Sequence, residues 1–72
     1  MTQVEKINEL AEIFEVDASE LKPDTILETL RWDSMAMLSV IALVKASFDK
    51  RLTGETLRGF KTIGDILAVM EA

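Results

Sequence analysis

Residues 31–37 read RWDSMAM and join an irregular segment to a long apolar run. Asp33 and Ser34 are both residue types preferred at the start of a helix, because their side-chain oxygens accept hydrogen bonds from free N–H groups there. From Ser34 to about Lys50 the sequence contains neither glycine nor proline, which favours a helix over that range. The stretch leaves two interpretations of Ser34: a helix cap, or a hydroxyl that carries another group.

The predicted helix is apolar on almost every side over its first three turns. Such a helix is either central in its fold or presents an apolar face to another molecule. Its inward stripe is predicted to consist of Leu38, Ile41, Val44 and Phe48.

A second helix is predicted over residues 3–15, because Thr2 followed by Glu5 forms a capping-box pattern. Asp17 and Glu20 repeat the pattern and predict one short turn before Pro23. The apolar face of the first helix follows helical spacing and is predicted to contain Val4, Ile7, Leu10, Ala11 and Phe14.

The C-terminal part predicts two more helices. Thr53 can cap a brief helix that runs to about Arg58 and stops at Gly59. Thr62 with Asp65 is a third helix-start pattern, and the helix it begins is predicted to reach about residue 71. Its apolar stripe is predicted to contain Ile63, Ile66, Leu67 and Met70.

The segment from Lys22 to Trp32 shows no clean period and is predicted to be a long loop, with Ile26 and Leu30 inserted into the core. No strand pattern is present. The sequence therefore predicts an all-α fold: a small four-helix bundle of three longer helices and one short one, with a long loop between the first two main helices. We expect residues 1–72 to form this single domain.

The composition excludes several functions. Histidine and cysteine are both absent, so a Ser-His nucleophile pair and a His- or Cys-ligated metal site cannot exist, and we expect neither an enzyme nor a metal protein. The net charge of −5 argues against nucleic acid as a partner. The longest apolar run, Met35 to Val44, is about half of the ~20 residues that a membrane span needs. No signal peptide is visible, and we expect a cytoplasmic protein.

The motif Asp33-Ser34-Met35 resembles the Asp-Ser-Leu motif of the acyl carrier proteins, the phosphopantetheine-binding carrier family, with Met in place of Leu. The resemblance covers essentially the whole chain, including the order of the elements and the long first loop. It also includes Leu30, Phe48-Asp49 and Thr62-Ile63-Gly64-Asp65-Ile66.

The resemblance implies that Ser34 carries 4′-phosphopantetheine, attached from coenzyme A by a separate phosphopantetheinyl transferase that uses Mg²⁺. It implies that Asp33 caps the helix and contacts the transferase and its metal, and that Met35 is an apolar anchor beside the arm. The implied function is to hold acyl groups as thioesters for fatty-acid, polyketide or related specialised biosynthesis. The implied partners are acyl-loading and acyl-processing enzymes, with the acyl chain as cargo and the protein as a monomer.

One departure from the family concerns the helix after the serine, whose outer face usually bears several acids that dock on basic partners. The matching positions here are Ala36, Ser39, Ala42, Lys45, Ala46 and Ser47. We therefore expect a specialised stand-alone member with Trp32, Met35 and Met37 as its partner-binding residues. Two alternatives stay open: an aminoacyl or peptidyl carrier, and an unmodified helical interaction module in which Ser34 is only a cap.

Overall fold

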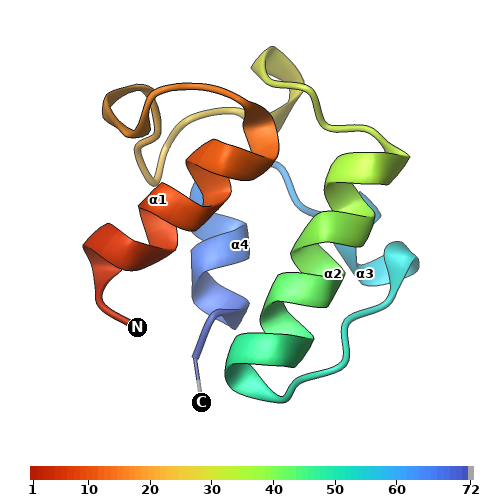
Figure 1. Cartoon of the computed structure of the whole chain (residues 1–72). Coiled ribbons are helices and arrows are strands. Elements are labelled where there is room, and N and C mark those ends of the chain that lie inside the picture. The colour runs from red at the N-terminus through yellow and green to blue at the C-terminus, as the bar shows by residue number, and fades with distance from the viewer. Residues whose placement is uncertain (72) are drawn as a thin grey trace.

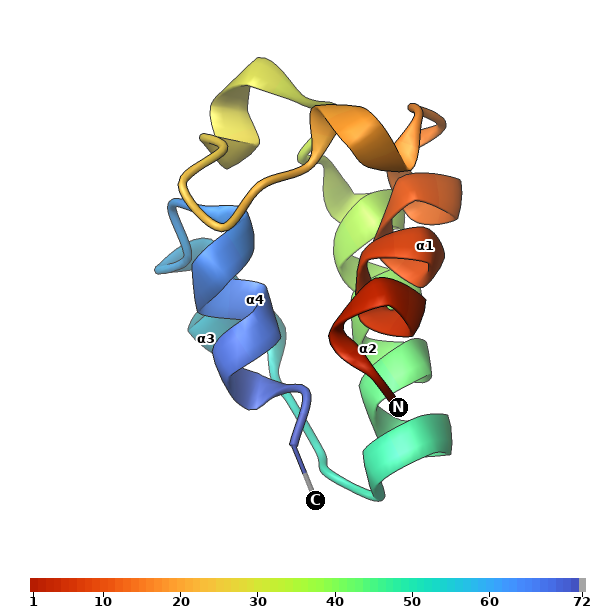
Figure 2. The same cartoon turned by 90° about the vertical axis from the view of Figure 1, so that its left-hand side faces the viewer.

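The computed structural model describes residues 1–71 and is built from helices joined by loops. The elements in chain order are α1 (Gln3–Phe14), 3-10 turns at Ala18–Glu20 and Leu27–Thr29, α2 (Ser34–Phe48), α3 (Gly54–Arg58) and α4 (Ile63–Val69). Figure 1 shows the four helices, and in the turned view of Figure 2 α1 and α2 lie on one side and α3 and α4 on the other. The expected all-α fold, with three longer helices and one short one, is confirmed for the described residues.

Local hydrogen bonds start the helices as the sequence predicts. At α1 the Thr2 hydroxyl accepts from the Glu5 N–H at 3.1 Å, and the Glu5 carboxylate accepts from the Thr2 N–H at 2.9 Å. At α4 the Asp65 carboxylate accepts from the N–H groups of Lys61 at 2.7 Å and Thr62 at 3.1 Å. These bonds favour the charged carboxylates and lower the pKa of Glu5 and of Asp65.

Each of the three longer helices ends one or two residues before its predicted end. The helix α1 stops at Phe14 because Glu15 adopts a left-handed conformation with φ 58°. In the same way α2 stops at Phe48, where Asp49 has φ 54°. A left-handed residue cannot continue a right-handed helix, and it lets the last carbonyls accept hydrogen bonds from the turn. The last helix, α4, stops at Val69.

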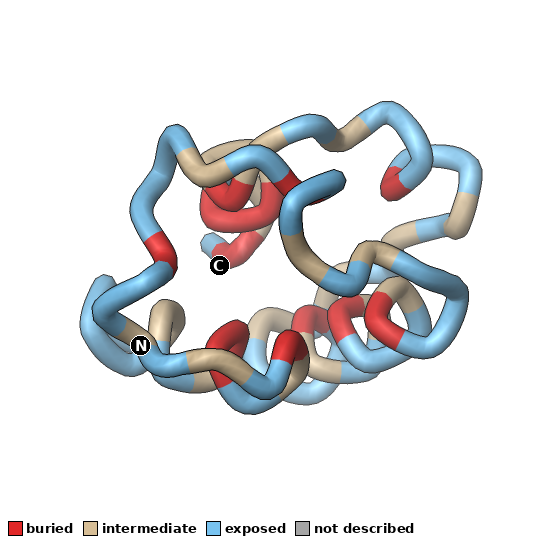
Figure 3. Tube along the Cα trace, turned by 90° about the horizontal axis from the view of Figure 1, so that it is seen from above, coloured by how far each residue is buried: buried red, intermediate tan, exposed pale blue. Residues whose placement is uncertain are grey.

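The core collects side chains from all four helices and the long loop, and Figure 3 shows the buried segments lining the inward sides of the chain. Burial of these apolar groups is the main force that holds so short a chain together. The fully buried side chains are Leu10, Leu27, Leu57, Ile63, Ile66, Met70, Val40 and Val44.

Two apolar residues that were predicted to face inward are exposed. Leu38 of α2 is 65% exposed and Val4 of α1 is 68% exposed. The buried side of α2 is instead formed by Ala36, Val40 and Val44, which lie four residues apart. Because α2 is apolar nearly all round, its own sequence does not select a face, and the contacts with the other helices do. The remaining predicted residues of the stripe, Ile41 and Phe48, are half-buried against the core.

The prediction for the long loop was wrong by one residue. Ile26 is 47% exposed, whereas Leu27 is fully buried. Leu30 packs, partly buried, against the core, as expected. Ile26 forms an isolated antiparallel bridge with Thr62, and this pairing turns its side chain outward and that of Leu27 inward.

Backbone hydrogen bonds fasten the long loop to the start of α4. The connection is held by Leu27 N–H to Lys61 O at 2.8 Å, Ile63 N–H to Thr25 O at 3.0 Å and Gly64 N–H to Pro23 O at 2.8 Å. The loop is thus fixed at its centre, and the stretch that follows it leads directly to Ser34.

Candidate functional site

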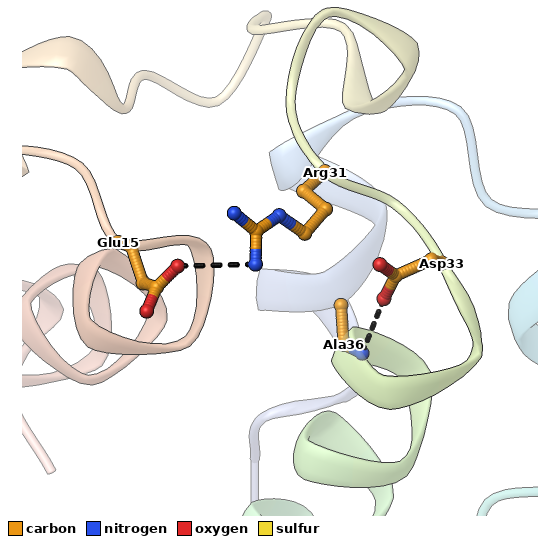
Figure 4. Close-up of polar contacts among 4 residues, drawn as sticks. All are labelled: Glu15, Arg31, Asp33 and Ala36. Carbon is orange, nitrogen blue, oxygen red and sulfur yellow. Dashed lines mark hydrogen bonds and ion pairs between the residues drawn. The ribbon is translucent and has the colours of Figure 1, made fainter.

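Ser34 is the first residue of α2 and is exposed. The N-cap position belongs to Asp33, whose carboxylate accepts a hydrogen bond from the Ala36 N–H at 2.9 Å (Figure 4). The Ala36 and Met37 N–H groups both have acceptors in Asp33, one in its side chain and one in its carbonyl. The Ser34 hydroxyl makes no hydrogen bond to the part of the chain that the structure describes, so it is available at the mouth of the helix.

The side chains around Ser34 divide into exposed and packed ones. Met35 is 77% exposed and Leu38 65% exposed, so the first turn of α2 shows a substantial apolar surface. Met37 is half-buried against the core. Trp32 is also half-buried, and its ring lies 5.9 Å from that of Phe14, measured between centroids. Its indole N–H is buried without a hydrogen-bond partner among residues 1–71.

On the α1 side of the site is a hollow of about 370 Å³. Its lining residues are Glu9, Glu12, Ile13, Glu15, Arg31, Asp33, Met35, Ala36 and Ser39. Glu15 and Arg31 form an ion pair at 3.1 Å across it, shown in Figure 4. Both side chains are about two-thirds exposed, so solvent screens the pair and it stabilises the fold little.

The acidic side chains beside Met35 were not predicted, because the family resemblance led us to expect acids on the helix that follows the serine. Glu9, Glu12 and Glu15 were interpreted as a solvated face of the first helix, and their three-residue spacing was the signal that they share one side. The packing of α1 beside α2 places that face on the hollow that Met35 also lines. Acidic side chains of α1 therefore lie beside the start of α2.

On the α3 side is a second hollow, of about 470 Å³. It is lined by Trp32, Asp33, Ser34, Met37, Leu38, Gly54 and Arg58. Arg58 was not singled out from the sequence, because nothing in its local pattern distinguishes it from other basic residues.

Within residues 1–71 there is no group of three or more acidic side chains close enough to hold a metal ion. None of the helices described has the length and hydrophobicity that a membrane crossing requires.

Comparison with known proteins assigns the family. The model of a phosphopantetheine attachment site matches residues 7–70. The chain is 35% identical over 72 residues to the acyl carrier protein of Streptococcus thermophilus, with 99% of this chain and 95% of the relative covered. It is 31% identical over 75 residues to the meromycolate extension acyl carrier protein of Mycolicibacterium smegmatis, with 97% and 76% covered. No solved structure matches the chain significantly.

The fold and the site together define a class of protein: a small helical bundle with an exposed serine at the start of its longest helix. The matches show that this chain belongs to the acyl carrier proteins, the family that bears a phosphopantetheine attachment site. The expected cofactor, covalently attached 4′-phosphopantetheine, and the expected carrier role in fatty-acid or related biosynthesis are thereby confirmed. Family membership also implies a phosphopantetheinyl transferase and acyl-processing enzymes as partners.

The residues at the start of α2 fit the phosphopantetheine group. The Ser34 hydroxyl is exposed and unengaged, and the positive end of the α2 helix dipole favours an anion beside it. Two hollows flank the serine and leave room for the arm on either side of α2.

Proposed function

We propose that this chain is an acyl carrier whose 4′-phosphopantetheine arm is attached to Ser34. The observation that supports the attachment point is the division of roles at the helix start: Asp33 caps α2, so the Ser34 hydroxyl is left without a structural task. Ser19, Ser39 and Ser47 lie in a turn or inside α2 and lack this position.

Loading converts the hydroxyl into a phosphodiester. The Ser34 oxygen attacks the phosphorus of coenzyme A that bears the pantetheine, adenosine 3′,5′-bisphosphate leaves, and the hydroxyl proton passes to a base of the transferase. Asp33 has one carboxylate oxygen on the Ala36 N–H, and the other can face the Mg²⁺ of the transferase complex. The arm supplies a thiol that carries the acyl group as a thioester, so the chain needs no cysteine of its own.

The chain itself catalyses no step under this proposal. It lacks histidine and cysteine, and Ser34 has no neighbouring base that could activate it as a nucleophile. Residues 1–72 act as one carrier domain, working as a monomer in the cytoplasm. Acyl cargo is favoured over aminoacyl cargo, because the matched relatives are acyl carrier proteins.

The partner-binding surface is proposed to be the first turn of α2 with Met35 as its main apolar anchor, since Met35 is the most exposed large apolar side chain beside Ser34. Trp32 and Met37 contribute only the parts of their side chains that the core leaves exposed. The glutamates of α1 form an acidic rim that suits a basic patch on the partner.

The attachment is tested with two serine variants of α2. Wild type, Ser34→Ala and Ser39→Ala are each co-expressed with a transferase of broad specificity, and their intact masses are measured. Wild type and Ser39→Ala should gain one phosphopantetheine unit, and Ser34→Ala none. Neither serine is the cap of α2, so both variants should keep the wild-type helical CD signal and midpoint. Loading of a folded Ser34→Ala protein would refute the assignment.

The docking surface is tested with Met35→Ala on the loaded carrier, with Ser39→Ala as the control from the same hollow. The apparent KM of the cognate acyl-processing enzyme should rise several-fold for Met35→Ala and stay near wild type for Ser39→Ala. An equal response to both variants would place the partner elsewhere.

A further inference from the structure

The hollow between α2 and α3 has one positively charged wall. Ser34, Met37 and Leu38 line it from α2, and Gly54 and Arg58 line it from α3. The serine proposed to carry the arm therefore shares a cavity with a guanidinium group that comes from a different helix.

Arg58 is the last residue of α3, and its side chain extends back toward the start of that helix, the direction that helical side chains ordinarily take. Here the Nη2 atom lies 4.0 Å from the point that a Cβ on Gly54 would occupy, one turn back toward the start of α3. The guanidinium therefore lies beside Gly54, which lines the same hollow as Ser34 and Arg58.

Arg58 forms no ion pair with an acid of residues 1–71. The ion pairs within residues 1–71 are Arg31–Glu15 and Lys45–Asp49. Asp33 lines the same hollow, but its carboxylate caps α2 through the Ala36 N–H and forms no ion pair with Arg58. Arg58 is exposed at the edge of the hollow and has no ion-pair partner there, so its guanidinium is available to an anionic ligand.

We propose that Arg58 binds the phosphodiester of the arm and holds the arm in the hollow between α2 and α3. The proposal rests on the proposed function, since it takes Ser34 as the attachment point. A planar guanidinium matches two oxygens of a phosphodiester with paired N–H donors, which a lysine cannot do. A neighbouring hollow of about 350 Å³ shares Trp32 and Arg58 with the first one, so the rest of the arm has room beyond it. Its other lining residues are Ile26, Glu28, Phe60 and Lys61.

The binding is tested by NMR on the full chain in its apo and loaded forms. Arg58→Gln removes the charge while keeping a polar side chain, and Arg51→Gln is the matched control because Arg51 is exposed and lies outside the hollow. The first readout is the ³¹P chemical shift of the loaded protein, compared with the same protein unfolded in urea. The second is the Nε–H resonance of each arginine before and after loading.

In wild type and Arg51→Gln the folded ³¹P resonance should be displaced from the unfolded one, and in Arg58→Gln it should move back toward the unfolded position. The Arg58 Nε–H should shift on loading, whereas that of Arg51 should not. An unchanged ³¹P shift in Arg58→Gln, or an Arg58 Nε–H that ignores loading, would overturn the proposal. Intact mass separates this from a failure of the proposed function: a wild-type chain that gains no arm refutes the attachment, whereas a loaded chain indifferent to Arg58 refutes only this inference.

Discussion

Gly64 is the position where a single added methyl group should break the connection between the long loop and α4. A Cβ at Gly64 would lie 2.9 Å from the Pro23 carbonyl oxygen, whereas ordinary contacts begin at 3.4 Å. The contacted atom is backbone, and the Gly64 N–H donates to that same oxygen at 2.8 Å. Gly64→Ala therefore has to move the two segments about 0.5 Å apart at the point where they are hydrogen-bonded.

The free energy of unfolding of Gly64→Ala should fall by roughly 0.5–4 kcal/mol, the sum of three terms. Overpacking at a close contact costs about 1–3 kcal/mol. Weakening the hydrogen bond to Pro23 costs about 0.5–1.5 kcal/mol more. The higher helix propensity of alanine recovers about 0.5–1 kcal/mol of this. In a domain of this size the midpoint of thermal unfolding should drop by about 4–8 °C for each kcal/mol.

The assay is urea unfolding followed by helical CD, with Gly54→Ala as the control for propensity. A Cβ at Gly54 meets nothing closer than the Arg58 side chain at 4.0 Å, so that variant should be as stable as wild type or slightly more stable. Amide exchange should rise at Leu27 and Ile63 in Gly64→Ala only, because their hydrogen bonds join the same two segments. A Gly64→Ala protein as stable as Gly54→Ala would refute the reasoning, since it would show that the loop yields without cost.

Two further predictions concern the roles of Asp33 and of the neighbouring residues Ile26 and Leu27. Asp33→Asn keeps a cap oxygen for the Ala36 N–H, so unfolding midpoints should stay near wild type while the rate of transferase loading falls; an unchanged rate would show that the charge of Asp33 has no part in loading. Leu27→Ala should cost about 2–5 kcal/mol of unfolding free energy in a urea titration because the side chain is fully buried, whereas Ile26→Ala, at 47% exposed, should cost well under half as much; the reverse order would restore Ile26 as the core residue.

The features predicted correctly from sequence are those set by residues within four positions of one another. Thr2 with Glu5, and Thr62 with Asp65, close hydrogen bonds over three residues, so their side chains alone specify the helix starts. The helix ends were predicted one or two residues too late. The left-handed residues that end α1 and α2 are Glu15 and Asp49, and neither is the glycine that usually marks such a position.

The features missed from sequence are set by contacts between distant segments. Whether Ile26 or Leu27 enters the core depends on pairing with residues about 35 positions later, and no local pattern encodes that register. Leu38 was placed inward because α2 is apolar on nearly every side, which leaves its orientation to α1 and α3. Arg58 reads as an ordinary basic residue at a helix end, and only the packing of α3 beside α2 brings it to the hollow that Ser34 also lines.

At the start of α2, one side chain begins the helix and another is free to carry a group: Asp33 caps α2, and the Ser34 hydroxyl makes no hydrogen bond to the described residues. A helix start requires a side-chain acceptor for its free N–H groups, and a carrier requires a hydroxyl that accepts nothing and lies open to an enzyme. A serine at the cap position would have its oxygen occupied by the helix, and modification would then disturb the cap. Asp33 takes the cap, which places Ser34 one residue inside the helix with a fixed backbone and an unengaged hydroxyl. With the arm attached at Ser34 as proposed, the adjacent acid lets the chain gain or lose that bulky group without changing the hydrogen bonds that begin its longest helix.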